Sequence, residues 1–236
     1  VMGKLLMTRE IYRVRLGEIC FDRKMIRRIV DIGLPAAIQQ SITSFSNVIV
    51  QSYINYFGTA AMAGYSATLR VDGFLQLPLQ SFNMTITTFV GQNIGAKEYK
   101  RVKKGIFTSW LMCSGIILVG SVIMFLKAPS IIGIFTEDAA VISVGSSMIR
   151  IFGSAYLFLP IIQILNGALR GAGRSKVPMY FMLGCFVLLR QIYLMIAVPM
   201  TKNVSVVFAG WPVTWVVCAI GMLVYYFKVD WLPKEE

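Results

Sequence analysis

Long apolar runs constrain the fold of this chain more than any other feature of its sequence. Six runs lie at about 29–56, 63–93, 106–127, 140–168, 178–200 and 206–228, with short polar segments between them. A bilayer core of ~30 Å takes about 20 helical residues to cross. Lipid offers no partners to backbone groups, so spanning segments must be helices or strands of a closed barrel. The runs are continuous and lack the alternation of barrel strands. We therefore predict an all-α integral membrane protein, a bundle of six transmembrane helices.

Composition supports this class and argues against an enzyme. Only 14% of the 236 residues are charged, whereas soluble domains carry about a quarter. The chain has no histidine, and its four cysteines show no metal-binding spacing. A membrane enzyme would need converging carboxylates, histidine or a metal motif, and Asp72 is the only acidic residue deep in a run. We predict no enzymatic activity and no metal or cofactor.

The basic residues predict the orientation. Eighteen lysines and arginines fall in residues 1–28, the connections 94–105 and 169–177, and the tail, against only Lys127 and Lys202 on the other side. Positive residues stay on the cytoplasmic side. We therefore expect a plasma-membrane protein with a cytoplasmic basic linker (1–28), a membrane lobe (29–228) and a cytoplasmic tail (229–236). The net charge of +12 then reflects topology and contact with the lipid bilayer, and requires no nucleic-acid partner.

Two rows of polar side chains run through the first two spans. The first comprises Gln39, Thr43, Asn47 and Gln51, and the second comprises Asp72, Gln76, Gln80, Asn83 and Thr87. Steps of three and four place each row on one helix face. Polar groups at this depth normally face a bundle interior or an aqueous cavity. We interpret them as the lining of a substrate cavity; the alternative is interhelical hydrogen bonding alone.

One cation lies deep in the fifth span. Arg190 and Asp72 each lie about ten residues from the predicted outer end of their span, or roughly 15 Å deep. Equal depth makes an ion pair possible, so we predict that the two side chains approach each other, directly or through one water, in at least one transport state. We add Arg190 to the candidate cavity residues.

Helix-breaking and small residues also interrupt the spans. Pro35, Pro78 and Pro160 lie inside apolar runs, where a proline permits a bend. Gly167 and Gly171 are four residues apart, a spacing that allows two helices to approach closely.

Several motifs resemble one transporter family. Gly33–Leu34–Pro35 opens the first span. Arg70–Val71–Asp72–Gly73–Phe74 leads to Gly91–Gln92–Asn93–Ile94–Gly95–Ala96, and Gly167–Ala168–Leu169–Arg170–Gly171–Ala172–Gly173 ends the fourth span. Together they resemble the carboxy-terminal lobe of multidrug and toxic compound extrusion (MATE) transporters, from about residue 25 to 228.

The resemblance implies half of a twelve-helix, two-lobe antiporter. Such a protein exports small amphipathic, often cationic, substrates by alternating access and uses sodium or protons as the coupling ion. The partner would be an amino-terminal lobe of the same transporter, and the basic start of the chain suggests a fragment beginning between lobes. One branch has carboxylates at the positions of Thr43 and Leu159, so this chain is more similar to the DNA-damage-inducible-type branch. Its coupling ion is then expected in the missing lobe.

Two other functions stay open at this stage. A lobe of a lipid-linked oligosaccharide flippase from the same superfamily would need a larger, more basic cavity. Arg70 and Arg190 would contribute to such a cavity. A non-transporting membrane accessory protein would have no water-filled cleft between the polar rows.

Overall fold

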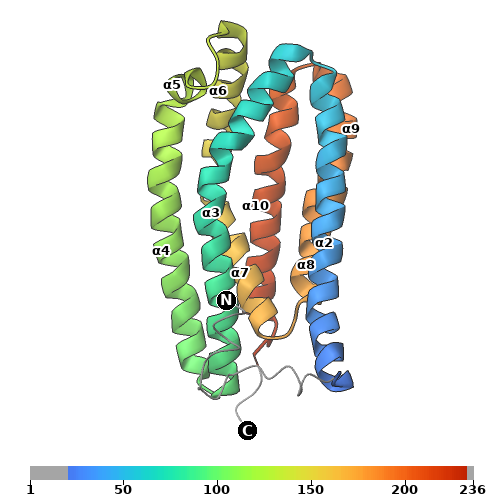
Figure 1. Cartoon of the computed structure of the whole chain (residues 1–236), viewed down its shortest axis with the longest axis vertical. Helices are drawn as coiled ribbons and strands as arrows, with labels where there is room; N and C mark the ends of the chain where they lie inside the picture. The colour runs from blue at the N-terminus through green and yellow to red at the C-terminus, as the bar shows by residue number, and fades with distance from the viewer. Residues whose placement is uncertain (1–20, 233–236) are drawn as a thin grey trace.

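Helices make up all the regular structure of the part of the chain that the computed structural model describes, residues 21–232. The helices are α2 (Arg23–Asn55), α3 (Thr59–Gly95), α4 (Tyr99–Leu126), α5 (Ala128–Gly133), α6 (Ala139–Gly153), α7 (Phe158–Gly171), α8 (Lys176–Leu183), the π-helical turn η2 (Gly184–Leu189), α9 (Arg190–Thr201) and α10 (Val204–Lys228). They form one elongated bundle (Figure 1). Each predicted apolar run is helical, which confirms the predicted all-α class.

Differences from the predicted boundaries have local causes. α2 begins inside the predicted linker because the Asp22 carboxylate caps it, accepting hydrogen bonds from the backbone nitrogens of Lys24 at 2.7 Å and Met25 at 3.3 Å. α5 was not predicted and lies in the connection after the third span. Residues 1–20 of the predicted linker and 233–236 of the predicted tail lie outside the described part.

The fourth predicted span is a pair of helices bent by 59°. The break covers residues 154–157, between α6 and α7, and Pro160 follows in the first turn of α7. A proline ring clashes with the carbonyl four residues before it, and that carbonyl belongs to Tyr156. Pro160 therefore explains why the break includes Tyr156, and the predicted bend is confirmed here.

Membrane-spanning character varies among the helices. Within residues 21–232, α4, the stretch Lys176–Thr201 and α10 are long and apolar enough to cross a membrane, and the bent α6–α7 pair adds a fourth span if it is counted as one. α2 and α3 are longer, with 33 and 37 residues, but they are less apolar than these three segments. Their polar rows cause this difference, so the two helices need a polar neighbour along part of their length.

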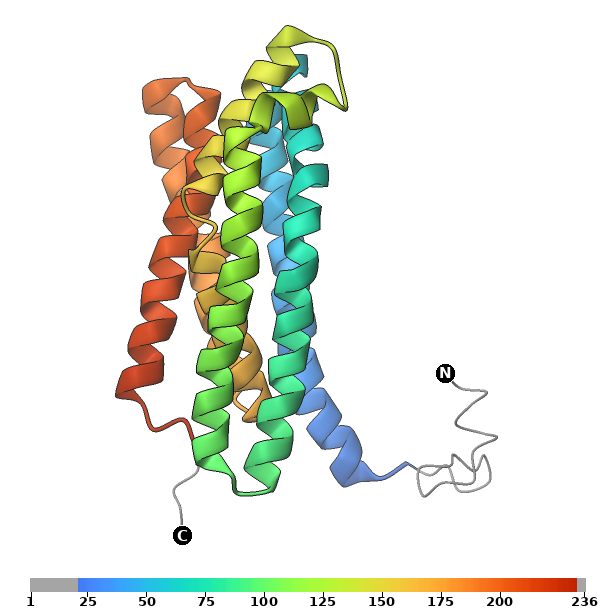
Figure 2. The same cartoon turned by 90° about the vertical axis from the view of Figure 1, so that its left-hand side faces the viewer.

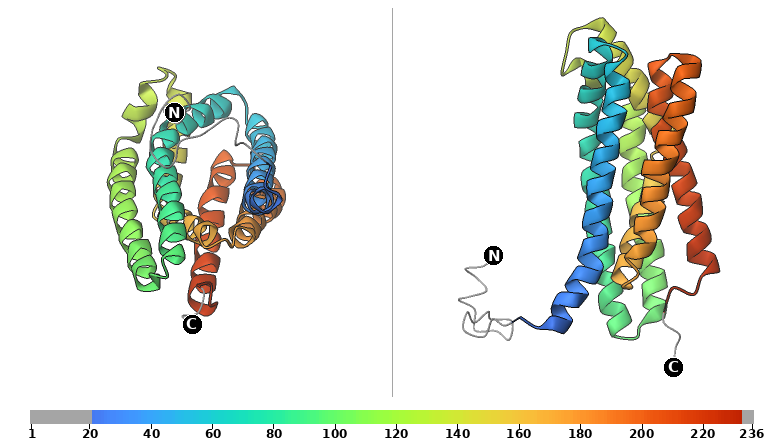
Figure 3. Two further views of the ribbon diagram at one scale, coloured as in Figure 1. Left: turned by 60° about the horizontal axis from the view of Figure 1, so that its bottom comes forward. Right: turned by 90° about the vertical axis from the view of Figure 1, so that its right-hand side faces the viewer.

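The bundle places α2 and α3 together on one side. α3 packs on α4, α6 and α7, whereas α2 packs mainly on α8, and α10 lies behind and between them (Figures 1 and 3). The start of α2, the α3–α4 and α7–α8 connections and the end of α10 lie at one end of the bundle (Figures 1 and 2). The described basic segments therefore gather at that end.

Candidate functional site

One residue of the first predicted row, Gln39, connects α2 to the end of α7, and Thr43 bonds within α2 beside it. Gln39 is buried, and its Oε1 accepts a hydrogen bond from Arg170 Nη2 at 2.8 Å. The half-buried Thr43 hydroxyl donates to the Gln39 backbone carbonyl at 2.7 Å. Arg170 belongs to the Gly167–Gly173 motif, so this contact joins that motif to the first row near the basic end of the lobe.

The π-helical turn η2 is joined to α2 through Ser46. A π-helical turn departs from the regular i→i+4 bonding of an α-helix and often marks a functional site. The buried Ser46 hydroxyl donates to the Phe186 carbonyl in η2 at 3.2 Å. Gln191 Nε2 donates to Ser46 Oγ at 2.8 Å. These bonds fix the helix turn that carries the neighbouring Arg190.

Arg190 is a buried cation with neutral partners. Its side chain is 3% exposed, and its guanidinium carbon lies 4.9 Å from the ring centroid of Trp211 and 5.4 Å from that of Phe186. Nη1 donates to Asn47 Oδ1 at 3.2 Å, and Nη2 lies 3.5 Å from Thr214 Oγ1. Aromatic faces attract a desolvated cation by about 2 kcal/mol. Asn47 itself is exposed, so Arg190 lies directly beneath the outer face of α2.

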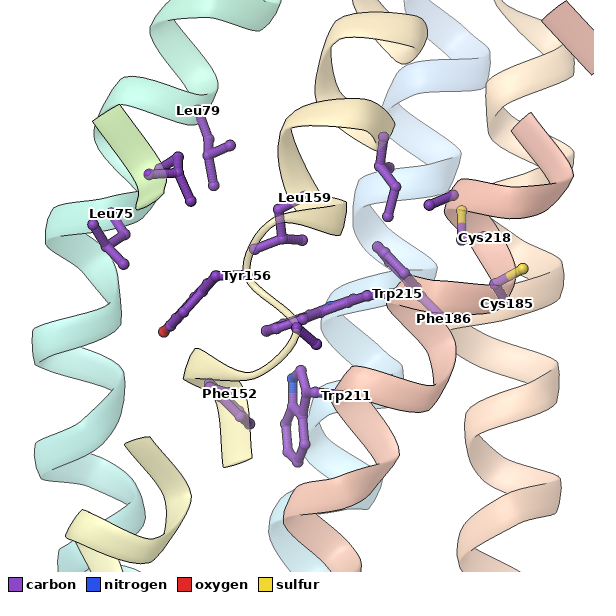
Figure 4. Packing of buried hydrophobic residues seen from close by; sticks show 14 of the residues in the cluster. Leu75, Leu79, Phe152, Tyr156, Leu159, Cys185, Phe186, Trp211, Trp215 and Cys218 are labelled. Carbon is purple, nitrogen blue, oxygen red and sulfur yellow. The ribbon is translucent and has the colours of Figure 1, made fainter. Parts of the chain in front are cut away.

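Asp72 is held by its own helix and by the break between α6 and α7. Its Oδ1 accepts a hydrogen bond from the Tyr156 hydroxyl at 2.6 Å, and its Oδ2 accepts from Gln76 Nε2 at 3.2 Å. The Tyr156 ring stacks on Trp215 of α10 at 5.7 Å, beside Phe152 (Figure 4). A carboxylate on α3 is thus connected through one aromatic side chain to the centre of the bundle.

Asp72 and Arg190 form no direct ion pair in the part of the chain that this structure describes, and their approach in another transport state stays a prediction. Within residues 21–232, Asp72 bonds to Tyr156 and Gln76 while Arg190 bonds to Asn47 and Thr214. Equal depth places the two residues at the same level along the membrane normal, but it does not place them on neighbouring helices. The neighbours of each helix decide the pairing, and α3 packs on α6 and α7.

The rest of the second row comprises two half-buried residues, Asn83 and Thr87, and one exposed residue, Gln80; the Thr87 hydroxyl donates to the Asn83 backbone carbonyl at 2.7 Å. Asn83 Nδ2 donates to the backbone carbonyl of Gln163 in α7 at 2.7 Å and lies 3.2 Å from its side-chain Oε1. Gln80 lies at the middle of α3 and is exposed. Five of the eight candidate residues thus bond outside their own helix, Asn47 among them, and Asn47 and Gln80 are the two candidates that the lobe leaves exposed.

Three partners in this site were missed from the sequence. Tyr156, Gln163 and Arg170 lie seven residues apart on the fourth span. In an unbroken helix, steps of seven return to nearly the same face, so the spacing indicated a third polar row, although Tyr156 lies in the break between α6 and α7. This row faces the rows of α2 and α3.

These features define a lobe of long apolar helices with an internal polar network. A family model described as MatE matches residues 35–196. The probable multidrug resistance protein NorM of Thermotoga maritima is 27% identical over 179 residues, 76% of this chain and 39% of that protein. The probable multidrug resistance protein YoeA of Bacillus subtilis is 24% identical over 161 residues, 66% of this chain and 34% of that protein.

Solved structures show the same fold. A crystal structure of MATE in the straight conformation aligns with a TM-score of 0.88 at 18% identity, covering 97% of this chain and 52% of that one. The Vibrio cholerae MATE transporter VcmN in the bent form aligns at 0.82 with 16% identity, covering 92% and 49%. The chain belongs to the MatE family, and it spans about half the length of these solved transporters. The family resemblance predicted from the motifs is confirmed.

Proposed function

We propose that this chain is the carboxy-terminal lobe of an exporter of amphipathic, often cationic, drugs and toxic compounds. The multidrug names of its relatives support export over the oligosaccharide-flippase and accessory-protein alternatives. In this proposal, an amino-terminal lobe of the same protein completes the pathway, and the two lobes open alternately to each side. Inward movement of sodium or protons drives the cycle. Thr43 and Leu159 carry no charge, which supports a coupling-ion site mainly in the other lobe.

One observation carries the proposal for the pathway. Gln40 and Gln80 lie at the middle of α2 and α3, and both are exposed on the lobe. A glutamine amide at mid-membrane depth finds no hydrogen-bond partner among acyl chains. These residues therefore need a polar surface in front of them, which a substrate pathway shared with a second lobe supplies.

The same proposal includes the orientation in the membrane. Both termini lie on the cytoplasmic side of the plasma membrane, where the basic connections contact anionic lipid. Substrates then enter the pathway from the end that carries the α3–α4 and α7–α8 connections.

Asp72 supplies the acidic group that a cationic substrate needs. Its carboxylate lies on the second polar row and is half-buried beside Gln76 and Tyr156. We expect Asp72→Asn to lower efflux of a lipophilic cation about tenfold, because loss of one favourable charge contact of ~1.4 kcal/mol changes affinity by that factor. The measurement is gradient-driven efflux of a fluorescent lipophilic cation from liposomes that contain the full-length protein.

Glu137→Gln is the matched control for that assay. Glu137 is exposed in the connection before α6, so its loss removes one negative charge away from α2 and α3 and is expected to leave efflux unchanged. Equal efflux rates for wild type and Asp72→Asn, at equal amounts of folded protein, would show that Asp72 does not contribute to the pathway. Failure of wild type to move any lipophilic cation under either gradient would refute the exporter proposal itself.

A further inference from the structure

An apolar groove lies on the side of the lobe away from the polar rows. α4 and α10 form its walls and α7 its floor, and Figure 2 shows α4 with α10 on one side and α3 on the other. The groove encloses about 320 Å³, and its lining includes Phe107 and Trp110 of α4, Leu165 of α7, and Leu223 and Phe227 of α10. The lining is almost wholly apolar and has the shape and chemistry to hold a hydrocarbon chain.

A polar cavity continues this groove toward the basic end of the bundle. It measures about 290 Å³, shares Tyr226 and Phe227 with the groove, and adds Lys103, Asp230 and Trp231. Trp231 lies 5.4 Å from Tyr226, ring to ring. Tryptophan and tyrosine gather where lipid headgroups meet the hydrocarbon core. The apolar and polar compartments therefore follow each other in the order of an acyl chain and its headgroup.

The charges around the polar cavity select among headgroups. Lys100, Arg101 and Lys104 are exposed on the same first turns of α4 as Lys103. The Asp230 carboxylate is the one acidic group among the residues that line the cavity. Basic clusters beside membrane helices on the cytoplasmic side attract anionic lipids, so the net field at this mouth favours a negative headgroup.

We propose that the groove between α4 and α10 is a binding site for one anionic phospholipid. An acyl chain occupies the apolar compartment between Phe107, Leu165 and Phe227, and the phosphate binds Lys103. The Asp230 carboxylate repels the negative headgroup and therefore limits the affinity of the site for the phospholipid. The site stands on the opposite side of the lobe from the substrate rows, and it does not depend on which substrate the protein exports.

Native mass spectrometry of the full-length protein tests the site. We expect phosphatidylglycerol to bind more tightly than phosphatidylcholine with the same acyl chains. Lys103→Gln should weaken phosphatidylglycerol binding about fivefold, because a basic residue near such a headgroup contributes about 1 kcal/mol. Asp230→Asn should strengthen it. Lys24→Gln is the matched control, since Lys24 carries the same charge at the same end of the bundle, on α2 and outside the cavity lining, and its effect should stay under about twofold.

Three results would overturn the proposal. Equal binding of phosphatidylglycerol and phosphatidylcholine would show that the site has no preference for an anionic headgroup. Equal weakening by Lys24→Gln and Lys103→Gln would show general attraction to the basic end of the lobe. Competition by free glycerol phosphate as strong as that by phosphatidylglycerol would show a phosphate site without a role for the apolar groove.

Discussion

Gly167→Ala is expected to lower the stability of the lobe by about 2 kcal/mol, the usual effect of overpacking a tight contact. A Cβ at Gly167 would lie 2.5 Å from the Asn83 carbonyl oxygen and 2.5 Å from Ile86 Cγ2, both on α3. In a membrane, helices associate through close packing rather than hydrophobic burial. α3 and α7 must separate to admit even one methyl group. Gly171, one turn later, faces the Thr87 carbonyl and Val90 of α3 in the same way.

Gly115→Ala provides the matched control for this prediction. A Cβ at Gly115 would meet nothing within 4 Å, so alanine should be neutral or raise stability by up to about 1 kcal/mol through helix propensity. Thermal unfolding of the full-length protein in detergent measures the difference. Equal melting temperatures for Gly167→Ala and Gly115→Ala would contradict the close α3–α7 contact.

Arg190→Glu is expected to destabilise the lobe by about 4 kcal/mol, the range found for an uncompensated buried charge. Trp211 and Phe186 present ring faces to the guanidinium. Ring faces carry partial negative charge, so they attract a cation and repel a carboxylate. Asn47 and Thr214 alone cannot replace that attraction.

Two further variants separate charge from packing at this position. Arg190→Met should stay within about 1 kcal/mol of wild type, because the lost cation–π attraction of ~2 kcal/mol is offset by removing a charge whose insertion costs ~3 kcal/mol. Arg150→Glu makes the same charge reversal at an exposed residue in the last turn of α6 and should have a small effect. Equal loss of stability in Arg150→Glu and Arg190→Glu would contradict the assigned environment of Arg190.

The sequence predicted the helices well because the apolar runs and their interruptions are local properties. Pro160 indicated the bend in the fourth span, and the Gly167–Gly171 spacing indicated close packing that α3 then provides. Helix ends were less certain, because capping by Asp22 extends α2 beyond its apolar run.

Side-chain partners were harder to predict because they depend on which helices are neighbours. Matching depths suggested that Asp72 pairs with Arg190, but α3 lies against the break that carries Tyr156. The π-helical turn before Arg190 also shifts the face on which that side chain lies. The row formed by Tyr156, Gln163 and Arg170 was visible in the sequence, but only the fold shows that it faces the other two rows.

Substrate protection at Gln80 tests most directly whether α2 and α3 line the export pathway. In full-length protein without other reactive cysteines, Gln80→Cys should react with a hydrophilic maleimide. A lipophilic cation at about ten times its Kd should slow that reaction about tenfold. Leu111→Cys, on the exposed apolar face at the middle of α4, should stay unreactive with or without substrate. A Gln80→Cys variant that transports normally yet resists the reagent as Leu111→Cys does would place Gln80 in lipid and contradict the proposed pathway.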